Sequence, residues 1–297
     1  MQINPSNVSN KLYFQVLGNP IAHSLSPSIH HHFAKLSNIS IDYSKQLIDV
    51  NHNFFENYVQ DFFSKHNNIG LNITLPFKER AFKLAHKTSN SAFFAKASNT
   101  LYLKDGEIFA DNTDGFGLVE DIKNYYGKTI QHKNILLLGA GGASRGALYN
   151  LVQEQPISIY IANRSLNKAQ DLINDSQAYN HNLTSVNCCT LDDLQNNNLN
   201  NLYLPKFDLI INATSMGMDN QDYTFFIHEN YICNHTFAYD MIYNKCSPFL
   251  EWSKRAKLEC VDGVGMLIQQ AAYAFKIWNN LDNLPSTQEL YEILRKN

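Results

Sequence analysis

The first 110 residues alternate short apolar segments with longer amphipathic ones. Short apolar segments of the kind that form strands lie at 12–17, 41–48 and 71–74. Segments whose apolar residues recur every three or four positions, as in helices, follow them at 26–36, 55–62 and 77–86. Ser26 and Pro27 predict the start of the first helix, with the serine as N-cap and the proline as first helical residue. Asp105-Gly106 lies between two strand-like segments and predicts a β-hairpin.

The second half of the chain repeats this alternation with more strongly buried strands. Strand-like apolar segments lie at 134–138, 157–162, 207–212 and 237–241. After Asp262-Gly263 the pattern stays helical, and Ile268, Ala271, Ala272 and Phe275 make one apolar face. The spacing of Ser286 and Glu289 predicts a capping box for a last helix. We expect the closing helices to pack on the N-terminal domain.

A glycine-rich turn, Gly139-Ala140-Gly141-Gly142-Ala143, separates the strand at 134–138 from the helical segment 145–152. Such a turn brings backbone N–H groups and a helix N-terminus against a pyrophosphate, so it predicts a dinucleotide site. The third position of the usual glycine fingerprint is not glycine here. A tight turn in an ordinary α/β domain is the alternative interpretation, although the strand at 157–162 completes the strand–helix–strand unit that a dinucleotide site needs.

Asn163-Arg164-Ser165, with Lys168 one turn later, follows that next strand. An NAD site usually has a carboxylate there for the ribose 2′-hydroxyl, whereas a guanidinium binds a 2′-phosphate. The sequence therefore predicts NADP as the cofactor. Cations at a solvated helix start are the alternative, but they would oppose the helix dipole.

Polar residues cluster where strands are expected to end or helices to begin. Ser24 and Ser26 follow the first strand, Asn72 and Thr74 share one face of the third, and Lys78 begins the next helix. Asn99 precedes the hairpin, Asp114 stands at a domain boundary, and Met266 and Gln270 form an i,i+4 pair opposite the apolar face. Each has a structural alternative as a cap or turn residue. Together they predict a site for a polyhydroxylated ligand at the carboxyl ends of the strands.

Composition narrows the class of protein further. The chain has 297 residues, 44% of them hydrophobic and 17% charged, with a net charge of −3, which is typical of a globular protein and gives no reason to expect a nucleic acid or an anionic membrane as partner. No apolar run reaches roughly 18 residues, and the N-terminus lacks the features of a secretory signal.

Five cysteines without a CxxC motif predict free thiols in the cytoplasm. Consecutive helical histidines at 30–32 point in different directions, so no metal is expected. Residues 196–201 are expected to form a polar surface loop.

The chain resembles the shikimate dehydrogenase family over nearly its whole length. The matching motifs include Asn72-Ile-Thr-Leu-Pro-Phe-Lys78 and Gly139-Ala-Gly-Gly-Ala-Ser-Arg-Gly146. Further matches in the same order lie at 18–27, 98–100, 111–115, 163–165, 211–215, 239–243 and 263–270. The resemblance implies an α/β fold with two domains and the site in the cleft between them: a substrate-binding catalytic domain (1–113, completed by 264–297) and a Rossmann-type NADP-binding domain (114–263).

The resemblance also implies NADPH-dependent reduction of 3-dehydroshikimate to shikimate. Lys78 and Asp114 would be the catalytic pair, and either could transfer the proton. The implied substrate-binding residues are Ser24, Ser26, Asn72, Thr74, Asn99, Asp114, Tyr243 and Gln270. The implied cofactor-binding residues are Gly139, Ala140, Gly141, Gly142, Ala143, Asn163, Arg164, Ser165, Lys168, Thr214, Met241 and Gly263. A quinate/shikimate dehydrogenase and a non-catalytic NADP-binding sensor are the alternatives, and a homodimer is left open.

Overall fold

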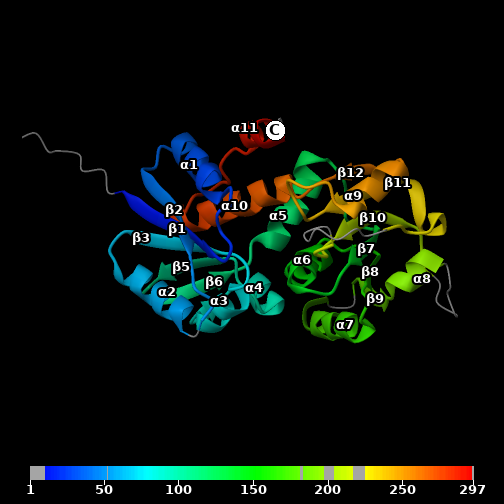
Figure 1. The fold of residues 1–297 in the computed structure, drawn as a ribbon, viewed down its shortest axis with the longest axis horizontal. Coiled ribbons are helices and arrows are strands. Elements are labelled where there is room, and N and C mark those ends of the chain that lie inside the picture. The colour runs from blue at the N-terminus through cyan, green and yellow to red at the C-terminus, as the bar shows by residue number, and fades with distance from the viewer. Residues whose placement is uncertain (1–10, 52, 181–182, 197–203, 217–224, 296–297) are drawn as a thin grey trace, which may run out of the picture. The chain divides into compact units, whose positions relative to one another are not determined.

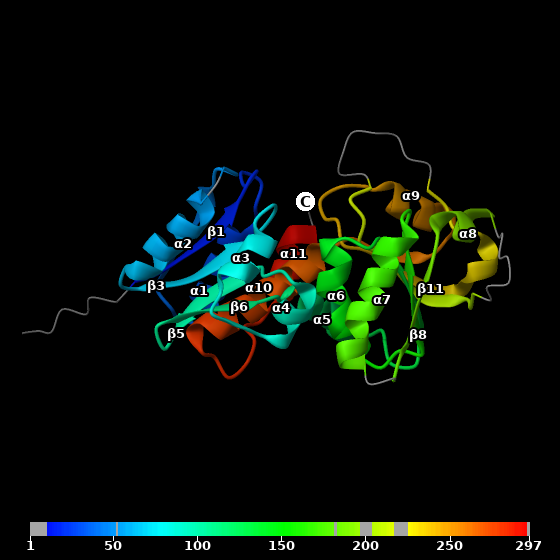
Figure 2. The same cartoon turned by 90° about the horizontal axis from the view of Figure 1, so that it is seen from below.

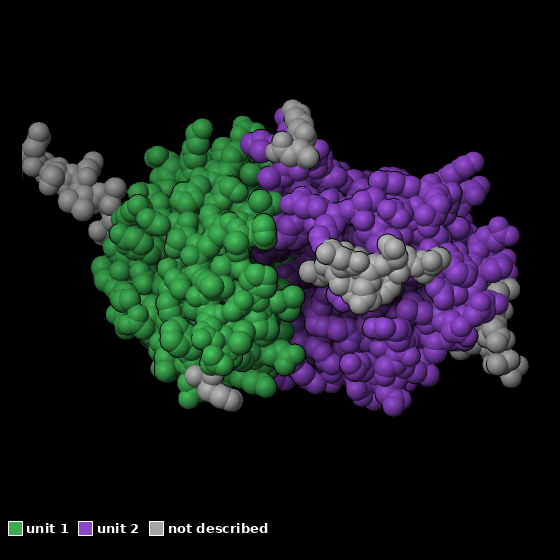
Figure 3. Space-filling view, in the orientation of Figure 1, with its two compact units in different colours: residues 1–92, 97–113, 271–290 green, residues 93–96, 114–270, 291–297 purple. Residues whose placement is uncertain are grey.

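A computed structural model describes residues 11–51, 53–180, 183–196, 204–216 and 225–295. The chain forms two compact units, coloured separately in Figure 3. Unit 1 comprises residues 1–92, 97–113 and 271–290, and unit 2 comprises 93–96, 114–270 and 291–297. Residues 264–270 and 291–297 thus belong to unit 2, whereas the sequence analysis expects them to complete the N-terminal domain.

Unit 1 contains a mixed sheet in the order β2-β1-β3-β5-β6-β4. Its strands are β1 (Leu12–Gly18), β2 (Ile41–Leu47), β3 (Asn68–Ile73), β4 (Lys87–Thr88), β5 (Thr100–Lys104) and β6 (Glu107–Asp111). Strand β1 runs parallel to both β2 and β3, while β5 and β6 form an antiparallel hairpin. The hairpin prediction is confirmed, because Asp105 and Gly106 both have the positive φ that its tight turn requires.

Helices pack on both faces of this sheet (Figures 1 and 2). They are α1 (Ser26–Leu36), α2 (Phe54–Ser64), α3 (Lys78–Leu84) and α4 (Asn90–Ala95), together with the unit's parts of α10 (Val264–Asn279) and α11 (Gln288–Arg295). Phe55, Val59 and Phe62 of α2 pack in one apolar cluster with Leu71 and Ile73 of β3. The ring of Trp278 in α10 stacks on Phe14 at 5.0 Å and donates its indole N–H to the Leu101 carbonyl at 3.2 Å.

Unit 2 contains a parallel sheet in the order β12-β11-β10-β7-β8-β9. Its strands are β7 (Asn134–Leu138), β8 (Ser158–Ala162), β9 (Ser185–Cys189), β10 (Phe207–Asn212), β11 (Ile232–Asp240) and β12 (Glu259–Val261). Its helical elements are α5 (Asp114–Glu120), the π-helix Asp121–Tyr125, α6 (Gly142–Gln153), α7 (Leu166–Asn180), α8 (Leu191–Asn196), the 3-10 helix Glu229–Tyr231 and α9 (Pro248–Arg255).

Alternate residues of β7 serve the two faces of this sheet. Ile135 and Leu137 pack with α6 and α7, while Leu136 and Leu138 pack with residues of α8 and α9. Both faces of the sheet are therefore covered by helices, which explains why its strands consist of continuous apolar residues. Figure 2 shows α7 and α9 on opposite sides of the sheet. This doubly wound arrangement confirms the predicted α/β class and the strand–helix–strand unit around the glycine turn.

Several local expectations need correction. Leu25, not Ser26, precedes α1, no side chain caps that helix, and Ser26 is its first residue. The last helix begins at Gln288, one residue later than a helix capped by Ser286 would, and Glu289 instead faces His32 at 3.6 Å. The face of α10 opposite the apolar stripe is buried too, and Met266 is part of the unit 2 core. The predicted loop at 196–201 lies outside the described residues except for Asn196, the last residue of α8, and the N-terminus also lies outside them.

All five cysteines, each within the described residues, are free thiols, as predicted. The three consecutive histidines have separate surroundings. His30 is fully buried, His31 is exposed beside the Pro27 carbonyl, and His32 faces Glu289. Among the residues that the structure describes, no three His, Cys, Asp or Glu side chains are grouped so as to hold a metal ion. No helix in the described ranges has the length and apolar character needed to cross a membrane.

Candidate active site

In unit 1, the Asn72 side chain meets the main chain of Asn99 at the end of β3. Asn72 is 5% exposed, and its Nδ2 donates to the Asn99 carbonyl at 3.2 Å and to Thr100 Oγ1 at 3.4 Å. Asn99 is 4% exposed and binds Thr113 twice: its Nδ2 lies 2.9 Å from Thr113 Oγ1, and its Oδ1 accepts from the Thr113 N–H at 2.9 Å. A network of this kind fixes the direction of each amide before any ligand arrives.

Asn72 is bonded to a tyrosine, which in turn stacks on a histidine. The Tyr43 hydroxyl donates to Asn72 Oδ1 at 2.6 Å, and the His30 ring stacks on Tyr43 at 4.5 Å and 8°. His30 is fully buried, and neither ring nitrogen has a hydrogen-bond partner among the described residues. Burial lowers the pKa of His30 to about 3, so the ring is neutral at physiological pH. His30 is also one helical turn beyond Ser26, on the same side of α1.

The two serines before and within the first turn of α1 bind each other. Ser24 Oγ lies 3.2 Å from Ser26 Oγ and accepts from the Ser26 N–H at 3.3 Å. Ser26 is buried and Ser24 half-buried. The pair therefore presents two hydroxyl groups in a fixed relation at the carboxyl end of β1, where an α/β sheet binds its ligands.

Thr74 and Lys78 follow the end of β3 directly. The Thr74 N–H donates to the Leu17 carbonyl at 2.9 Å, and the Lys78 carbonyl accepts from the Ser98 N–H at 2.8 Å. Lys78 is the first residue of α3 and is half-buried. Because Ser98 precedes Asn99, this contact fixes the main chain of Lys78 beside that of Asn99. The polar residues predicted from β1, β3 and the hairpin start thus share one end of this sheet.

Unit 2 holds the other residues predicted for the substrate. Asp114 is the first residue of α5, directly after Thr113 in the chain, and it is half-buried. Gln270 is 8% exposed and donates to the Leu267 carbonyl at 2.9 Å. A side chain at Gly117 of α5 would lie 2.7 Å from the Gln270 nitrogen, so α5 and α10 pack closely here. Tyr243 follows β11, and burial raises the pKa of its hydroxyl, which keeps it protonated.

The glycine turn of unit 2 has one glycine that packing requires and two that it does not. Gly139 has a φ of +97°, and a Cβ there would lie 3.0 Å from Thr214 Cγ2. A Cβ at Gly141 or Gly142 would meet no atom of the described residues within 4 Å. No side chain caps α6, and buried Ser144 closes the turn by donating to the Gly139 carbonyl at 2.8 Å. The open side of the turn therefore offers backbone N–H groups at a helix N-terminus, which suits a phosphate group.

The segment after β8 places two cations at the start of α7. Asn163 Nδ2 donates to the Ser165 carbonyl at 2.8 Å, which shapes the turn. Arg164, Ser165 and Lys168 are exposed, and α7 has no acidic residue in its first turn. Within the described ranges, the side chains of Arg164 and Lys168 make no hydrogen bond or ion pair. Two cations without protein partners at a helix N-terminus are unfavourable unless an anion binds there.

The remaining cofactor candidates follow the carboxyl ends of β10, β11 and β12. Thr214 Oγ1 donates to Asn212 Oδ1 at 2.7 Å, and the Met241 N–H donates to the Asn212 carbonyl at 3.0 Å. A Cβ at Gly263 would lie 2.5 Å from the Met241 carbonyl oxygen, so glycine is required there. These three residues share one edge of the sheet with the glycine turn, as expected for a doubly wound fold.

Three residues that orient these groups were not predicted from the sequence. Asn212 and Asp240 lie at this edge of the sheet, and Tyr43 binds the Asn72 side chain. Buried Asn212 donates to Asp240 Oδ1 at 3.0 Å, and Asp240 also accepts from Ser247 and from the Ile242 N–H. Burial raises the pKa of Asp240. A signal for both was present, since each ends an apolar strand with a polar residue. Tyr43 gave no such signal, because an aromatic residue in a strand is usually core.

The chain is similar in sequence to known proteins. Residues 16–101 match the family profile described as the shikimate dehydrogenase substrate binding domain, and residues 121–218 match that of shikimate / quinate 5-dehydrogenase. The chain is 40% identical over 284 residues to a protein of Legionella pneumophila named shikimate dehydrogenase (NADP(+)), covering 95% of this chain and 98% of that protein. A Colwellia psychrerythraea protein of the same name is 41% identical over 290 residues, covering 95% and 96%.

The fold also matches a solved structure. Shikimate 5-dehydrogenase from Thermus thermophilus, crystallised with NADP(H) and shikimate, superposes with a TM-score of 0.78 at 26% identity, covering 96% of this chain and 99% of that one.

Proposed function

Because the chain belongs to the shikimate dehydrogenase family, we propose that it catalyses the reversible reduction of 3-dehydroshikimate to shikimate with NADPH. The observation that supports this most directly is the junction of β3 and α3. There Lys78 is tied through its carbonyl to Ser98, next to the Asn72 and Asn99 amides. A lysine whose main chain is fixed beside oriented hydrogen-bonding groups suits a ketone or alcohol that carries neighbouring hydroxyl groups.

The proposed substrate contacts follow from hydrogen-bonding chemistry. The hydroxyls of Ser24 and Ser26, with that of Tyr243, would bind the carboxylate of shikimate, because hydroxyl groups donate to such oxygens. Asn72, Thr74, Asn99, Asp114 and Gln270 would bind its ring hydroxyls. The four uncharged groups suit these hydroxyls because each can both donate and accept, and the Asp114 carboxylate can accept from a hydroxyl.

The proposed cofactor contacts are those of unit 2. Backbone N–H groups of residues 139–143 would bind the pyrophosphate, since the open side of Gly141 and Gly142 leaves room for it. Arg164 and Lys168 would bind the 2′-phosphate, with Asn163 and Ser165 shaping the turn, which favours NADP over NAD. Thr214, Met241 and Gly263 would line the remainder of the site.

NADPH, when bound, supplies a hydride to the carbonyl carbon. The Lys78 ammonium would stabilise the negative charge that develops on the carbonyl oxygen and would supply or relay its proton. Asp114 would bind the adjacent hydroxyl and orient the ammonium.

Initial rates with four substrate pairs test this function: shikimate and quinate, each with NADP and NAD. We expect NADP reduction with shikimate and a much lower rate with quinate. Comparable rates with quinate and NAD would favour a quinate/shikimate dehydrogenase, a description that the second matching profile also carries. Binding of NADP without any turnover would favour a non-catalytic sensor, although Lys78 and Asp114 are both present.

Two wider proposals accompany the reaction. The five free thiols support a reducing compartment such as the cytoplasm. The partners proposed are small molecules, and light scattering of the purified protein tests the homodimer that the sequence leaves open.

A further inference from the structure

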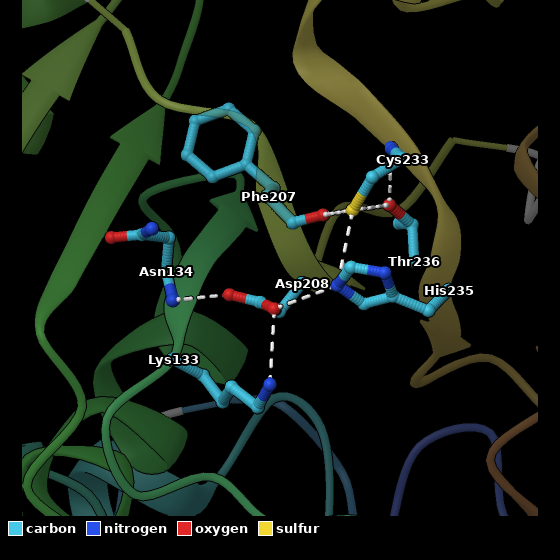
Figure 4. Close-up of polar contacts among 7 residues, drawn as sticks. All are labelled: Lys133, Asn134, Phe207, Asp208, Cys233, His235 and Thr236. Atoms are coloured by element: carbon cyan, nitrogen blue, oxygen red, sulfur yellow. Dashed lines mark hydrogen bonds and ion pairs between the residues drawn. The ribbon is translucent and has the colours of Figure 1, made fainter.

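A cysteine, a histidine and an aspartate meet at the amino end of the unit 2 sheet (Figure 4). Cys233 is the second residue of β11, and its Sγ lies 3.4 Å from His235 Nε2. The same nitrogen lies 3.1 Å from Oδ1 of Asp208, the second residue of β10. Cys233 is half-buried and His235 is 68% exposed, so small reagents can reach the cluster.

Asp208 holds the imidazole in place. Its Oδ2 accepts from the Asn134 N–H at 2.9 Å, and its Oδ1 lies 3.1 Å from Lys133 Nζ. Although burial acts to raise the pKa of Asp208, the hydrogen bonds from Asn134, Lys133 and His235 keep it below its ordinary value. The carboxylate is therefore charged at neutral pH, and the Lys133 cation offsets its repulsion of any negative charge on the sulfur.

The geometry defines what the imidazole can do for the thiol. One nitrogen, Nε2, faces both Asp208 and Cys233, so it carries the proton that the carboxylate accepts. That single proton can reach the sulfur only as the longer arm of a bifurcated hydrogen bond, and a protonated Nε2 has no lone pair with which to act as a base. A donor, and more so a cationic one, stabilises the thiolate form that attacks electrophiles. Thr236 fixes the cysteine by accepting from its N–H at 2.9 Å and donating to the Phe207 carbonyl at 2.7 Å.

The other cysteines lack such a partner. Burial raises the pKa of Cys188 and Cys260, and that of Cys189 to about 12, which keeps these thiols protonated. Cys246 is exposed, with no histidine or carboxylate bonded to its sulfur among the described residues, so it serves as an internal reference. A metal site is not supported as an alternative, since the described residues hold no suitable group of three ligands.

From this cluster we infer that Cys233 is a modification site, the thiol of this protein that forms mixed disulfides with small-molecule disulfides. The Cys233 thiol gives its proton to water, and the thiolate attacks one sulfur of the disulfide. The reagent's S–S bond breaks as the new one forms, and the departing thiolate takes up a proton. Cys233 is oxidised, and one half of the reagent is reduced to a thiol. The site lies seven residues before the carboxyl end of β11, about 23 Å along the strand.

Alkylation mapped by mass spectrometry tests the inference. The protein is treated with limiting iodoacetamide between pH 6 and 9, and the rate at each cysteine is measured. At pH 6.5 we expect Cys233 to react about tenfold faster than Cys246, because a thiolate partner matters most where ordinary thiols are protonated. His235→Gln should bring the two rates together, while exposed His66→Gln in unit 1 should leave the ratio unchanged.

Oxidised glutathione provides the second arm. One tripeptide should attach per chain, at Cys233, and dithiothreitol should release it. Since His235 is exposed, His235→Gln should fold normally, which circular dichroism checks. Equal rates at Cys233 and Cys246, an unchanged ratio in His235→Gln, or attachment first at Cys246 would each overturn the inference. None of these results depends on whether the protein oxidises shikimate.

Discussion

The Tyr43 hydroxyl donates a 2.6 Å hydrogen bond to Oδ1 of Asn72, so an aromatic residue of β2 sets the direction of an amide on β3. Burial raises the pKa of Tyr43 well above its ordinary value, which keeps the hydroxyl a donor at every physiological pH. The Asn72 Nδ2 is then directed toward Asn99 and Thr100. Tyr43 would therefore act on the proposed substrate site through another residue.

Tyr43→Phe should raise the KM for shikimate about fivefold and leave kcat nearly unchanged, because one neutral hydrogen bond contributes about 1 kcal/mol. Asn72 would still be present but less firmly oriented. Tyr58→Phe is the matched control, since it removes a 2.8 Å bond to Gln15 that lies outside the proposed site. Steady-state kinetics of both variants decide the matter. An equal change in both would mean that Tyr43 contributes only to stability.

His30 should make the stability of the protein depend on pH. Burial lowers its pKa to about 3 in the folded protein, against an ordinary value of 6.5. The unfolded chain therefore binds the extra proton, and stability that is complete above pH 6.5 falls as the pH falls toward 3. At about 1.4 kcal/mol per pH unit, this residue should cost about 2 kcal/mol by pH 5.

Urea unfolding at pH 7 and pH 5 measures this effect. In His30→Phe, which keeps the aromatic stack on Tyr43, the decrease in the free energy of unfolding should be smaller by that amount. The exposed His66→Gln should behave like the unaltered protein. Identical pH dependence in His30→Phe would show that another group is responsible.

Periodicity could predict the elements in which local pattern and packing agree. The strand 134–138 and the hairpin around Asp105-Gly106 are examples, because apolar runs and turn residues act locally. The short strands β4, β9 and β12 were not predicted, since each is fixed by pairing with a neighbour distant in sequence and carries little apolar signal. Ser26 was placed as a cap because its type favours caps, whereas Ser24 binds its N–H and Leu25 ends the turn.

The sequence could nominate a residue for the proposed site where the residue type is unusual for its position. Asn72 within an apolar strand and Arg164 in place of a carboxylate are such residues. Tyr43, His30 and Met266 could not be assigned in this way, because their roles depend on which side chains the fold brings against them. The openness of Gly141 and Gly142, in contrast to the tight packing of Gly139, is likewise invisible without coordinates.

Lys78→Ala should lower kcat by roughly 10²- to 10⁴-fold, the usual size of an acid–base contribution, with a much smaller effect on shikimate binding. The ammonium matters most when charge develops on the carbonyl oxygen. Lys83→Ala, an exposed position of the same helix, is the control and should keep normal turnover. Asp114→Asn should also impair turnover with an unchanged circular dichroism spectrum. A normal kcat with a raised KM in Lys78→Ala would make this lysine a binding residue only.

Gly141→Ala should weaken NADP binding without destabilising the protein. A methyl group there meets no atom within 4 Å in the part of the chain that the structure describes, so it would occupy space proposed for the pyrophosphate. Gly263→Ala should instead lower the melting temperature, because its Cβ would lie 2.5 Å from the Met241 carbonyl oxygen. Thermal unfolding without cofactor and the KM for NADP separate the two effects. Normal NADP binding by Gly141→Ala would place the pyrophosphate elsewhere.

Arg164→Ala should change cofactor choice. Arg164 is exposed and, within the described ranges, its side chain makes no bond to a protein group, so its removal should leave the fold intact. A hydrogen-bonded charge contributes roughly 1.5–3 kcal/mol, which predicts NADP binding weaker by roughly 10- to 100-fold. NAD lacks the 2′-phosphate, so its KM and that of shikimate should hardly change.

Lys168→Ala should add to the effect, because Lys168 supplies a second charge in the first turn of α7. Arg255→Ala, an exposed cation at the end of α9, is the matched control and should leave both cofactors unaffected. If Arg164→Ala weakened NAD and NADP equally, the arginine would serve the shape of the turn, and the 2′-phosphate would be bound by other residues.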